Sequence, residues 1–163
     1  MLPVELERYI HEHIPLSKAM AVSVVSVEPG TVALQAPLAP NSNHQGTVFG
    51  GSASALAILA GWALLHVRLQ AEGVADRLVI QRNTLEYQQP IGGTFSACSR
   101  LEHPERWQQF MAMLSRKGKA RITVAARLEH QSRAVGAFTG EFVALAATRR
   151  GTHSPLVPSR PGA

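Results

Sequence analysis

The chain has 163 residues, a length that fits one ordinary domain with its own core. Its 45% apolar and 17% charged residues lie in the globular range, which argues against wholesale disorder. The formal net charge of +5 and the sequence pI near 10.1 favour an anionic partner, such as a phosphate-bearing cofactor, a nucleic acid or an acidic carrier protein. A soluble domain that happens to be basic explains the same charge, so charge alone does not identify a partner.

We expect the protein to reside in the cytoplasm. Its single cysteine, Cys98, cannot form an intramolecular disulfide, and Glu5, Arg8 and His11 interrupt any apolar run that would make a signal peptide. The uncharged run over 49–65 is rich in Gly, Ala and Ser and is shorter than the ~20 residues that a membrane span needs. We therefore expect no membrane association.

The chain begins with a predicted short helix and a hairpin. Apolar residues recur at helical spacing over 4–13, and Pro15 should stop this helix. Two β-branched stretches, over 21–27 and 31–36, flank the turn residues Glu28-Pro29-Gly30 and predict a pair of strands.

A long central helix is predicted next. A loop over 37–48 leads to Gly50-Gly51, where the helix begins; it runs to Leu69, and Gly73 is a suitable stop. The residues of this helix are apolar or small on nearly every side. Protein should therefore surround it.

Four further strands are predicted, over 77–88, 94–101, 119–130 and 133–147. The third alternates apolar and polar residues most clearly, as a sheet covered on one face requires. The segment 104–116 is either a helix or a long connection. Three prolines over 151–163 predict a disordered tail after a single domain over 1–150.

These elements predict an α+β fold in which a curved antiparallel sheet wraps one long central helix.

The stretch that carries chemistry is Asn43-His44-Gln45-Gly46-Thr47-Val48-Phe49-Gly50-Gly51, at the start of that helix. Free backbone N–H groups and the positive end of the helix dipole suit an oxygen that gains negative charge when a carbonyl group is attacked. A purely structural loop-to-helix junction has the same composition, so the stretch alone does not decide.

The stretch resembles the Asn-x-x-Gly-Thr-x-His-Gly-Gly motif of the phenylacetyl-CoA-thioesterase-like branch of the hotdog superfamily. With Phe49 in place of the histidine, it is more similar to the thioesterase-like domain of the YiiD C-terminal type, which often follows an acetyltransferase. Leu59-Ala60-Gly61-Trp62 resembles that family's Leu-Ala-Gly-Trp, and Tyr87-Gln88-Gln89-Pro90 followed by Gly93 resembles its Tyr-x-x-Pro and glycine. The likeness spans about residues 20 to 147 and implies a hotdog fold.

The resemblance implies a hydrolase that cleaves an acyl-CoA or acyl-carrier-protein thioester by water attack. Asn43, Gly50 and Gly51 match the motif's catalytic positions. Ile58 stands where the thioesterase branch places an acid, and no carboxylate occurs between residues 49 and 70. The general base is therefore unassigned, and Glu86 is the candidate substitute.

Candidate substrate-binding residues lie on the motif, the helix and the following strand. They are Thr47, Phe49, Ser54, Trp62 and Tyr87. Ser54 is equally a small packing residue, and aromatic side chains on buried elements are more often core than channel. Asn83 and Glu86 lie on opposite faces of a regular strand, so at most one of them points toward the helix.

Coenzyme A is expected only as part of the substrate, and no other cofactor is expected. Basic residues that could meet its phosphates are Arg100, Arg116, Lys117, Lys119, Arg149 and Arg150, although a solvated strand face explains most of them. The seven histidines show no metal-ligand spacing, so no metal is predicted.

Three alternatives remain open. A non-catalytic acyl-thioester binding module fits the missing acid, and a hotdog hydratase or dehydratase is disfavoured because the motif lacks the His and the acid that such lyases use. A nucleic-acid binder is disfavoured because the nine aromatic residues are not interleaved with basic ones. In every case we expect a homo-oligomer, a dimer or tetramer of hotdog subunits, because a single sheet leaves edges to pair.

Overall fold

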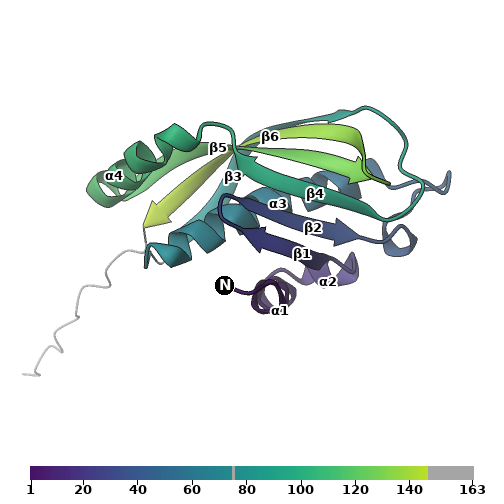
Figure 1. Cartoon of the computed structure of the whole chain (residues 1–163), viewed down its shortest axis with the longest axis horizontal. Coiled ribbons are helices and arrows are strands. Elements are labelled where there is room, and N and C mark those ends of the chain that lie inside the picture. Colours follow the sequence, from purple (N-terminus) through teal and green to yellow (C-terminus); the bar gives the residue numbers. More distant parts are fainter. Residues whose placement is uncertain (75, 147–163) are drawn as a thin grey trace, which may run out of the picture.

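The computed structural model describes residues 1–74 and 76–146 (Figure 1). The predicted tail over 151–163 and the domain end at 150 lie outside the described residues. Two short helices open the chain, α1 (Pro3–His13) and α2 (Pro15–Ala19). Pro15 stops the first helix as predicted and begins the second, because proline has no N–H to lose in a first helical turn.

Six strands form one antiparallel sheet in the order β1-β2-β4-β5-β6-β3. The strands are β1 (Ser23–Glu28), β2 (Thr31–Ala36), β3 (Asp76–Tyr87), β4 (Phe95–Leu101), β5 (Lys119–His130) and β6 (Arg133–Ala146). Two short 3-10 turns, η1 (Ala39–Asn41) and η2 (Pro104–Arg106), lie in the connections. The predicted α+β architecture, a curved sheet around one long helix, is confirmed (Figure 1).

The central helix, α3 (Gly50–Ala71), packs on the inner face of the sheet, and Gly61 allows the close approach. A Cβ atom at position 61 would lie 2.9 Å from the Phe142 ring and 3.3 Å from the Val124 side chain. Among the described residues, α3 alone is long and apolar enough to cross a membrane, but 61% of its most apolar window is buried inside the protein. A helix buried to this extent is typical of a protein core.

The segment left open between helix and connection forms a helix, α4 (Trp107–Lys117). Its buried residues Trp107, Phe110 and Leu114 share one face, and Gly118, at φ 67°, ends it and turns the chain into β5. Trp107 fixes α4 to the C-terminal end of α3. Its indole N–H donates to the Glu72 carboxylate at 3.3 Å, and the Arg68 guanidinium lies 4.1 Å from its ring centroid.

The two edges of the sheet differ. Helix α1 covers the β1 edge, where the Glu7 carboxylate accepts the Val24 N–H at 2.9 Å and His11 Nε2 lies 2.8 Å from the Val22 carbonyl. At the opposite edge, no described segment pairs with the outer side of β3, whose Val79 side chain is 51% exposed. The molecule therefore has one covered edge and one open edge.

Candidate active site

The start of α3 carries free backbone donors. Phe49 is the N-cap residue and makes no side-chain cap, while its carbonyl accepts the N–H groups of Ser52 at 2.9 Å and Ala53 at 3.1 Å. The N–H groups of Gly50 and Gly51 have no acceptor among the described residues. Two donors thus remain available at the positive end of a 22-residue helix.

Asn41, which the sequence analysis did not single out, holds this junction in place. It is buried, and its amide N–H groups donate to the carbonyls of Met20 at 2.9 Å and Pro37 at 2.8 Å. The backbone carbonyl of Asn41 accepts the Phe49 N–H at 2.8 Å. Nothing local in the sequence signals this role, because the partners come from three separate segments.

The Asn43 side chain makes its hydrogen bonds within the motif loop, to Gln45 and Thr47. Its Oδ1 accepts the N–H groups of Gln45 at 2.8 Å and Thr47 at 3.2 Å, and its Nδ2 donates to Thr47 Oγ1 at 2.9 Å. Both polar atoms of the Asn43 side chain are therefore engaged within the loop. Asn43 holds Thr47, which in turn lines the cavity beside Gly50.

Tyr87, at the end of β3, reaches the helix start and donates its phenol O–H to the Gly50 carbonyl at 2.9 Å. Successive residues of a strand point to opposite faces, so the neighbouring Glu86 points away from α3. Within one subunit, Glu86 is therefore not brought together with Gly50. Asn83, four residues before Tyr87, shares the face that points toward the helix.

A cavity of about 470 Å³ lies on the Gly50 side of the helix start. Its walls are the motif loop with Gln45 and Thr47, the first turn of α3, and the end of β3 with Tyr87 and Gln88. The walls offer hydroxyl and amide groups beside the free Gly50 N–H. This cavity is the polar side of the candidate site.

Two adjoining apolar cavities lie on the Gly51 side, between α3 and α2. The first, of about 320 Å³, is bounded by Phe49, Gly51 and Ser52, and the second, of about 310 Å³, reaches Ile58 and Trp62. Both are also lined by Leu16, Met20 and Ala55, so they adjoin each other, and we call the pair the apolar channel. Trp62 and Phe49 thus line the apolar channel, whereas Ser54 lines none of the cavities around the helix start.

The lining of these cavities contains no carboxylate, imidazole or thiol group. Apart from the Tyr87 phenol, no titratable side chain lines any of the three. On α3, the titratable residue nearest in sequence to the cavity-lining residues is His66, one turn beyond Trp62. Its ring stacks with the rings of Tyr9 and Trp62, and it does not line the cavity that Trp62 lines. Within the described ranges, no three His, Cys, Asp or Glu side chains are close enough to hold a metal ion.

Comparison with known proteins agrees with this geometry. The family model described as "Putative thioesterase (yiiD_Cterm)" matches residues 4–146. A protein of unknown function from Chlorobaculum tepidum is 28% identical, with a TM-score of 0.82, over 90% of this chain and 98% of that one.

Two further solved structures carry thioesterase names. One, described as a putative thioesterase from Shewanella oneidensis, is 25% identical with a TM-score of 0.79, over 88% of this chain and 96% of that one. The other, from Pseudomonas aeruginosa and described as a probable thioesterase, is 27% identical with a TM-score of 0.75, over 90% and 97%. Since the family model covers nearly all the described residues and these neighbours share the helix-in-sheet architecture, the chain belongs to the YiiD C-terminal thioesterase-like family of hotdog-fold proteins.

Proposed function

We propose that the protein hydrolyses an acyl thioester carried by coenzyme A or by an acyl carrier protein, and that the thioester carbonyl binds at the start of α3. The observation that carries the proposal is the pair of unused N–H groups on Gly50 and Gly51. They stand where a polar cavity and an apolar channel meet. Such donors stabilise the negative charge that develops on the carbonyl oxygen during attack.

The apolar channel suits the acyl chain. Gly51, Ala55, Ile58 and Trp62 form one stripe on α3, and α2 closes the channel with Leu16 and Met20. The channel's inner part has almost no polar lining, which favours a hydrocarbon or aromatic group over a polar one. The polar cavity on the Gly50 side is left for the thiol-bearing arm and the attacking water.

The reaction needs only water as co-reactant. The water oxygen bonds to the carbonyl carbon, the carbon–sulfur bond breaks with its electron pair leaving on sulfur, and a proton passes from the water to the sulfur. The products are a carboxylic acid and a free thiol. Gly50 and Gly51 hold the oxyanion, and Tyr87 fixes the first helical turn through the Gly50 carbonyl.

A binding module that retains the acyl thioester without cleaving it is the second candidate. The observation that favours it is the absence of any carboxylate or imidazole from the lining of the three cavities in the described chain. A general base contributes roughly 10²- to 10⁴-fold to such a reaction. Hydrolysis would then depend on a base supplied across a subunit interface.

The open β3 edge supports a homodimer built by pairing two β3 strands, with each helix start close to the second subunit. β3 is 12 residues long and carries Asn83 on the face of Tyr87. A site shared between two subunits accommodates the missing base, since the second subunit would add side chains that one chain lacks.

The test is thiol release from a panel of short, medium, long and aromatic acyl-CoA thioesters, with Gly50→Pro and Gly50→Ala as a matched pair. Phe49, at ψ 133°, has the extended backbone that a following proline requires, and proline is tolerated in a first helical turn. Both substitutions add a Cβ at 3.4 Å from the Tyr87 ring, but only Gly50→Pro removes the N–H. We expect Gly50→Pro to lower kcat by roughly 10²- to 10³-fold and Gly50→Ala to retain most activity.

Circular dichroism must show that both variants are folded. A folded Gly50→Pro variant with undiminished turnover would remove the Gly50 N–H from the mechanism. Saturable binding of acyl-CoA without any thiol release would establish the binding module instead. If neither binding nor release is seen across the panel, both candidates fail.

A further inference from the structure

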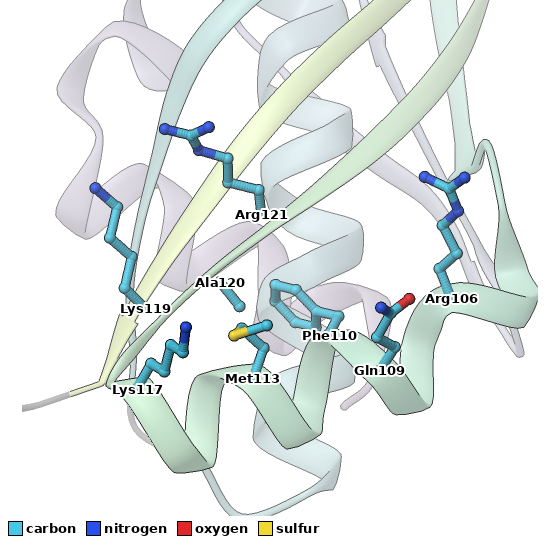
Figure 2. A pocket seen from close by; sticks show the side chains of 8 residues that line it. All are labelled: Arg106, Gln109, Phe110, Met113, Lys117, Lys119, Ala120 and Arg121. Atoms are coloured by element: carbon cyan, nitrogen blue, oxygen red, sulfur yellow. The ribbon is translucent and has the colours of Figure 1, made fainter.

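A second hollow lies between α4 and β5, away from the candidate active site (Figure 2). Its cavity of about 600 Å³ is in the size range of small-molecule sites. Four of its eight lining residues are basic, and none is acidic: Arg106, Lys117, Lys119 and Arg121. Arg106 and Lys117 stand at the two ends of α4, whereas Lys119 and Arg121 stand on β5.

These four charges are not neutralised by the described part of the chain. The ion pairs found there involve Arg82, His103 and Arg127, and none of the four basic residues of the hollow. Like charges around one concavity raise its positive potential and cost folding free energy. A bound polyanion would offset that cost.

The apolar part of the lining is formed by Phe110, Met113 and Ala120, with Gln109 beside them, on the α4 side of β5. The Lys119 and Arg121 side chains leave the opposite face of that strand, at its uncovered edge (Figure 2). Phe110 and Ala120 are nearly fully buried, so this floor belongs to the packed core and is preformed. The hollow therefore suits a ligand that combines a flat apolar part with several negative charges, rather than a simple inorganic ion.

The backbone of β5 adds a donor to the hollow. β4 ends its pairing at Leu101 opposite Val124, and the Glu102 N–H reaches the Thr123 carbonyl at 3.1 Å, so residues 119–122 of β5 have no strand on that side. Backbone groups of alternate residues point to the same side of a strand, so Arg121 directs its N–H the same way as Thr123. No described segment accepts that N–H outside the sheet ladders.

The hollow is distinct from the Gly50 site of the same subunit. α4 is fixed to the C-terminal end of α3 through Arg68 and Glu72, and a 22-residue helix spans ~33 Å. The two sites thus lie at opposite ends of α3.

We propose that this hollow binds a phosphorylated nucleoside, with its phosphates on Arg106, Lys117, Lys119 and Arg121 and its base over Met113, above the buried Phe110. Arginine presents a planar fork of donors that matches phosphate oxygens, and lysine adds point charge. The shared chemistry has two sources, a free nucleotide or the phosphorylated adenosine end of a coenzyme A whose thioester lies at the helix start of a second subunit, because the ~33 Å length of α3 separates the two sites of one subunit. Only the second source rests on the proposed function.

Isothermal titration with adenosine 3′,5′-bisphosphate tests the site without any turnover. We compare the native protein with the double variant Lys119→Glu/Arg121→Glu and with Arg100→Glu/Arg133→Glu as control. The control pair consists of exposed strand residues that do not line the hollow, and it changes the net charge by the same amount. Lys119→Glu/Arg121→Glu should weaken binding by roughly a hundredfold, the scale of losing two charge-assisted hydrogen bonds, while the control should change it little.

Three outcomes would overturn the proposal: no saturable binding by the native protein, equal weakening by the two double variants, or inorganic phosphate binding as tightly as the nucleotide. If the hollow binds only an acidic carrier protein, the native protein will show no saturable binding of the nucleotide. If the KM for an acyl-CoA rises in Lys119→Glu/Arg121→Glu but the KM for the same acyl group on pantetheine does not, the nucleotide is that of coenzyme A. If nucleotide binding is lost and neither KM changes, the hollow serves a free nucleotide.

Discussion

Ile58 shows how a single position sets the character of the candidate site. The residue stands seven positions beyond Gly51, which is ~10 Å along the helix axis, and it lines the inner apolar cavity with Trp62 and Ile80. Among the lining side chains, only the Ser17 hydroxyl and the Trp62 indole N–H could hydrogen-bond a carboxylate at this position. That hydroxyl donates to the Ile10 and Ile14 carbonyls. The apolar residue therefore fits a chain-binding wall and not a catalytic acid of the same subunit.

Replacing Ile58 by aspartate should destabilise the protein by roughly 1 to 3 kcal/mol without restoring catalysis. The loss should be larger at pH 8 than at pH 5, because burial raises the pKa of a carboxyl group and favours its neutral form. Thermal unfolding at the two pH values measures this, with Ile58→Asn as the control of similar size that cannot ionise. A folded Ile58→Asp variant with faster thiol release would instead show that the missing acid limits the rate.

At the residue scale, the backbone part of the candidate site is a local sequence pattern, whereas its side-chain contacts are not. Gly50 and Gly51 were identifiable because a glycine pair at a helix start is a local pattern. The engagement of Asn43 within its own loop and the anchoring by Asn41 were not predicted, since both depend on hydrogen bonds set by the folded loop. The sequence left open whether Asn83 or Glu86 points toward the helix, because the direction of each β3 side chain depends on an irregularity between Ile80 and Arg82 that no sequence pattern predicts.

At the scale of elements, α1 docks on α3 through stacked aromatic rings. The Tyr9 ring lies 4.6 Å from the His66 ring, and His66 lies 4.8 Å from Trp62. His13 stacks on the other face of Tyr9 at 4.0 Å. Burial, with a smaller contribution from the charge of nearby His13, lowers the pKa of His66 below its ordinary value of 6.5.

The docking of α1 should therefore weaken in acid. Between the lowered pKa of folded His66 and 6.5, the unfolded chain binds a proton that the folded chain does not, so the free energy of unfolding is at its full value above pH 6.5 and declines as the pH falls. One such group contributes at most about 1.4 kcal/mol per pH unit. Urea unfolding between pH 7.5 and 5 measures the decline, which should be smaller in His66→Phe, a variant that keeps an aromatic ring but cannot titrate.

An equal decline in both proteins would mean that other groups carry the pH dependence. Hydrogen exchange of the α1 amides supplies an independent measurement, since they should exchange faster at pH 5 in the native protein than in His66→Phe after correction for intrinsic rates.

Most element boundaries followed from the sequence to within two residues, because the apolar periodicity changes clearly between helix and strand. The segment that forms helix α4 was left open between a helix and a connection, since its apolar residues cover only one narrow face. The partners of Trp107, Arg68 and Glu72, lie at the C-terminal end of α3, far away in the sequence. The channel under α2 was likewise unpredicted. It forms between elements that are about 40 residues apart in sequence, so no local pattern describes it.

At the scale of the whole molecule, the two sheet edges differ in whether a second subunit could pair with them. The β1 edge is occupied by α1, and Glu7 accepts the Val24 N–H that another strand would otherwise need. The β3 edge presents 12 residues with no described neighbour on its outer side. Natural monomers rarely leave so long an edge unprotected, so we propose a dimer through β3.

The exposed valines on these edges supply a matched test of that dimer. Val79 on β3 is 51% exposed and Val25 on β1 is 52% exposed, so a lysine at either position should be tolerated by the isolated subunit. Val79→Lys places a charge on the strand that would pair with its copy across a two-fold axis, where two lysines would repel each other. Sedimentation equilibrium should show a dimer for the native protein and for Val25→Lys, and at least tenfold weaker association for Val79→Lys. A native protein that is monomeric at micromolar concentration, or a Val25→Lys variant that dissociates as readily as Val79→Lys, would exclude pairing through β3 and with it a site completed by the second subunit.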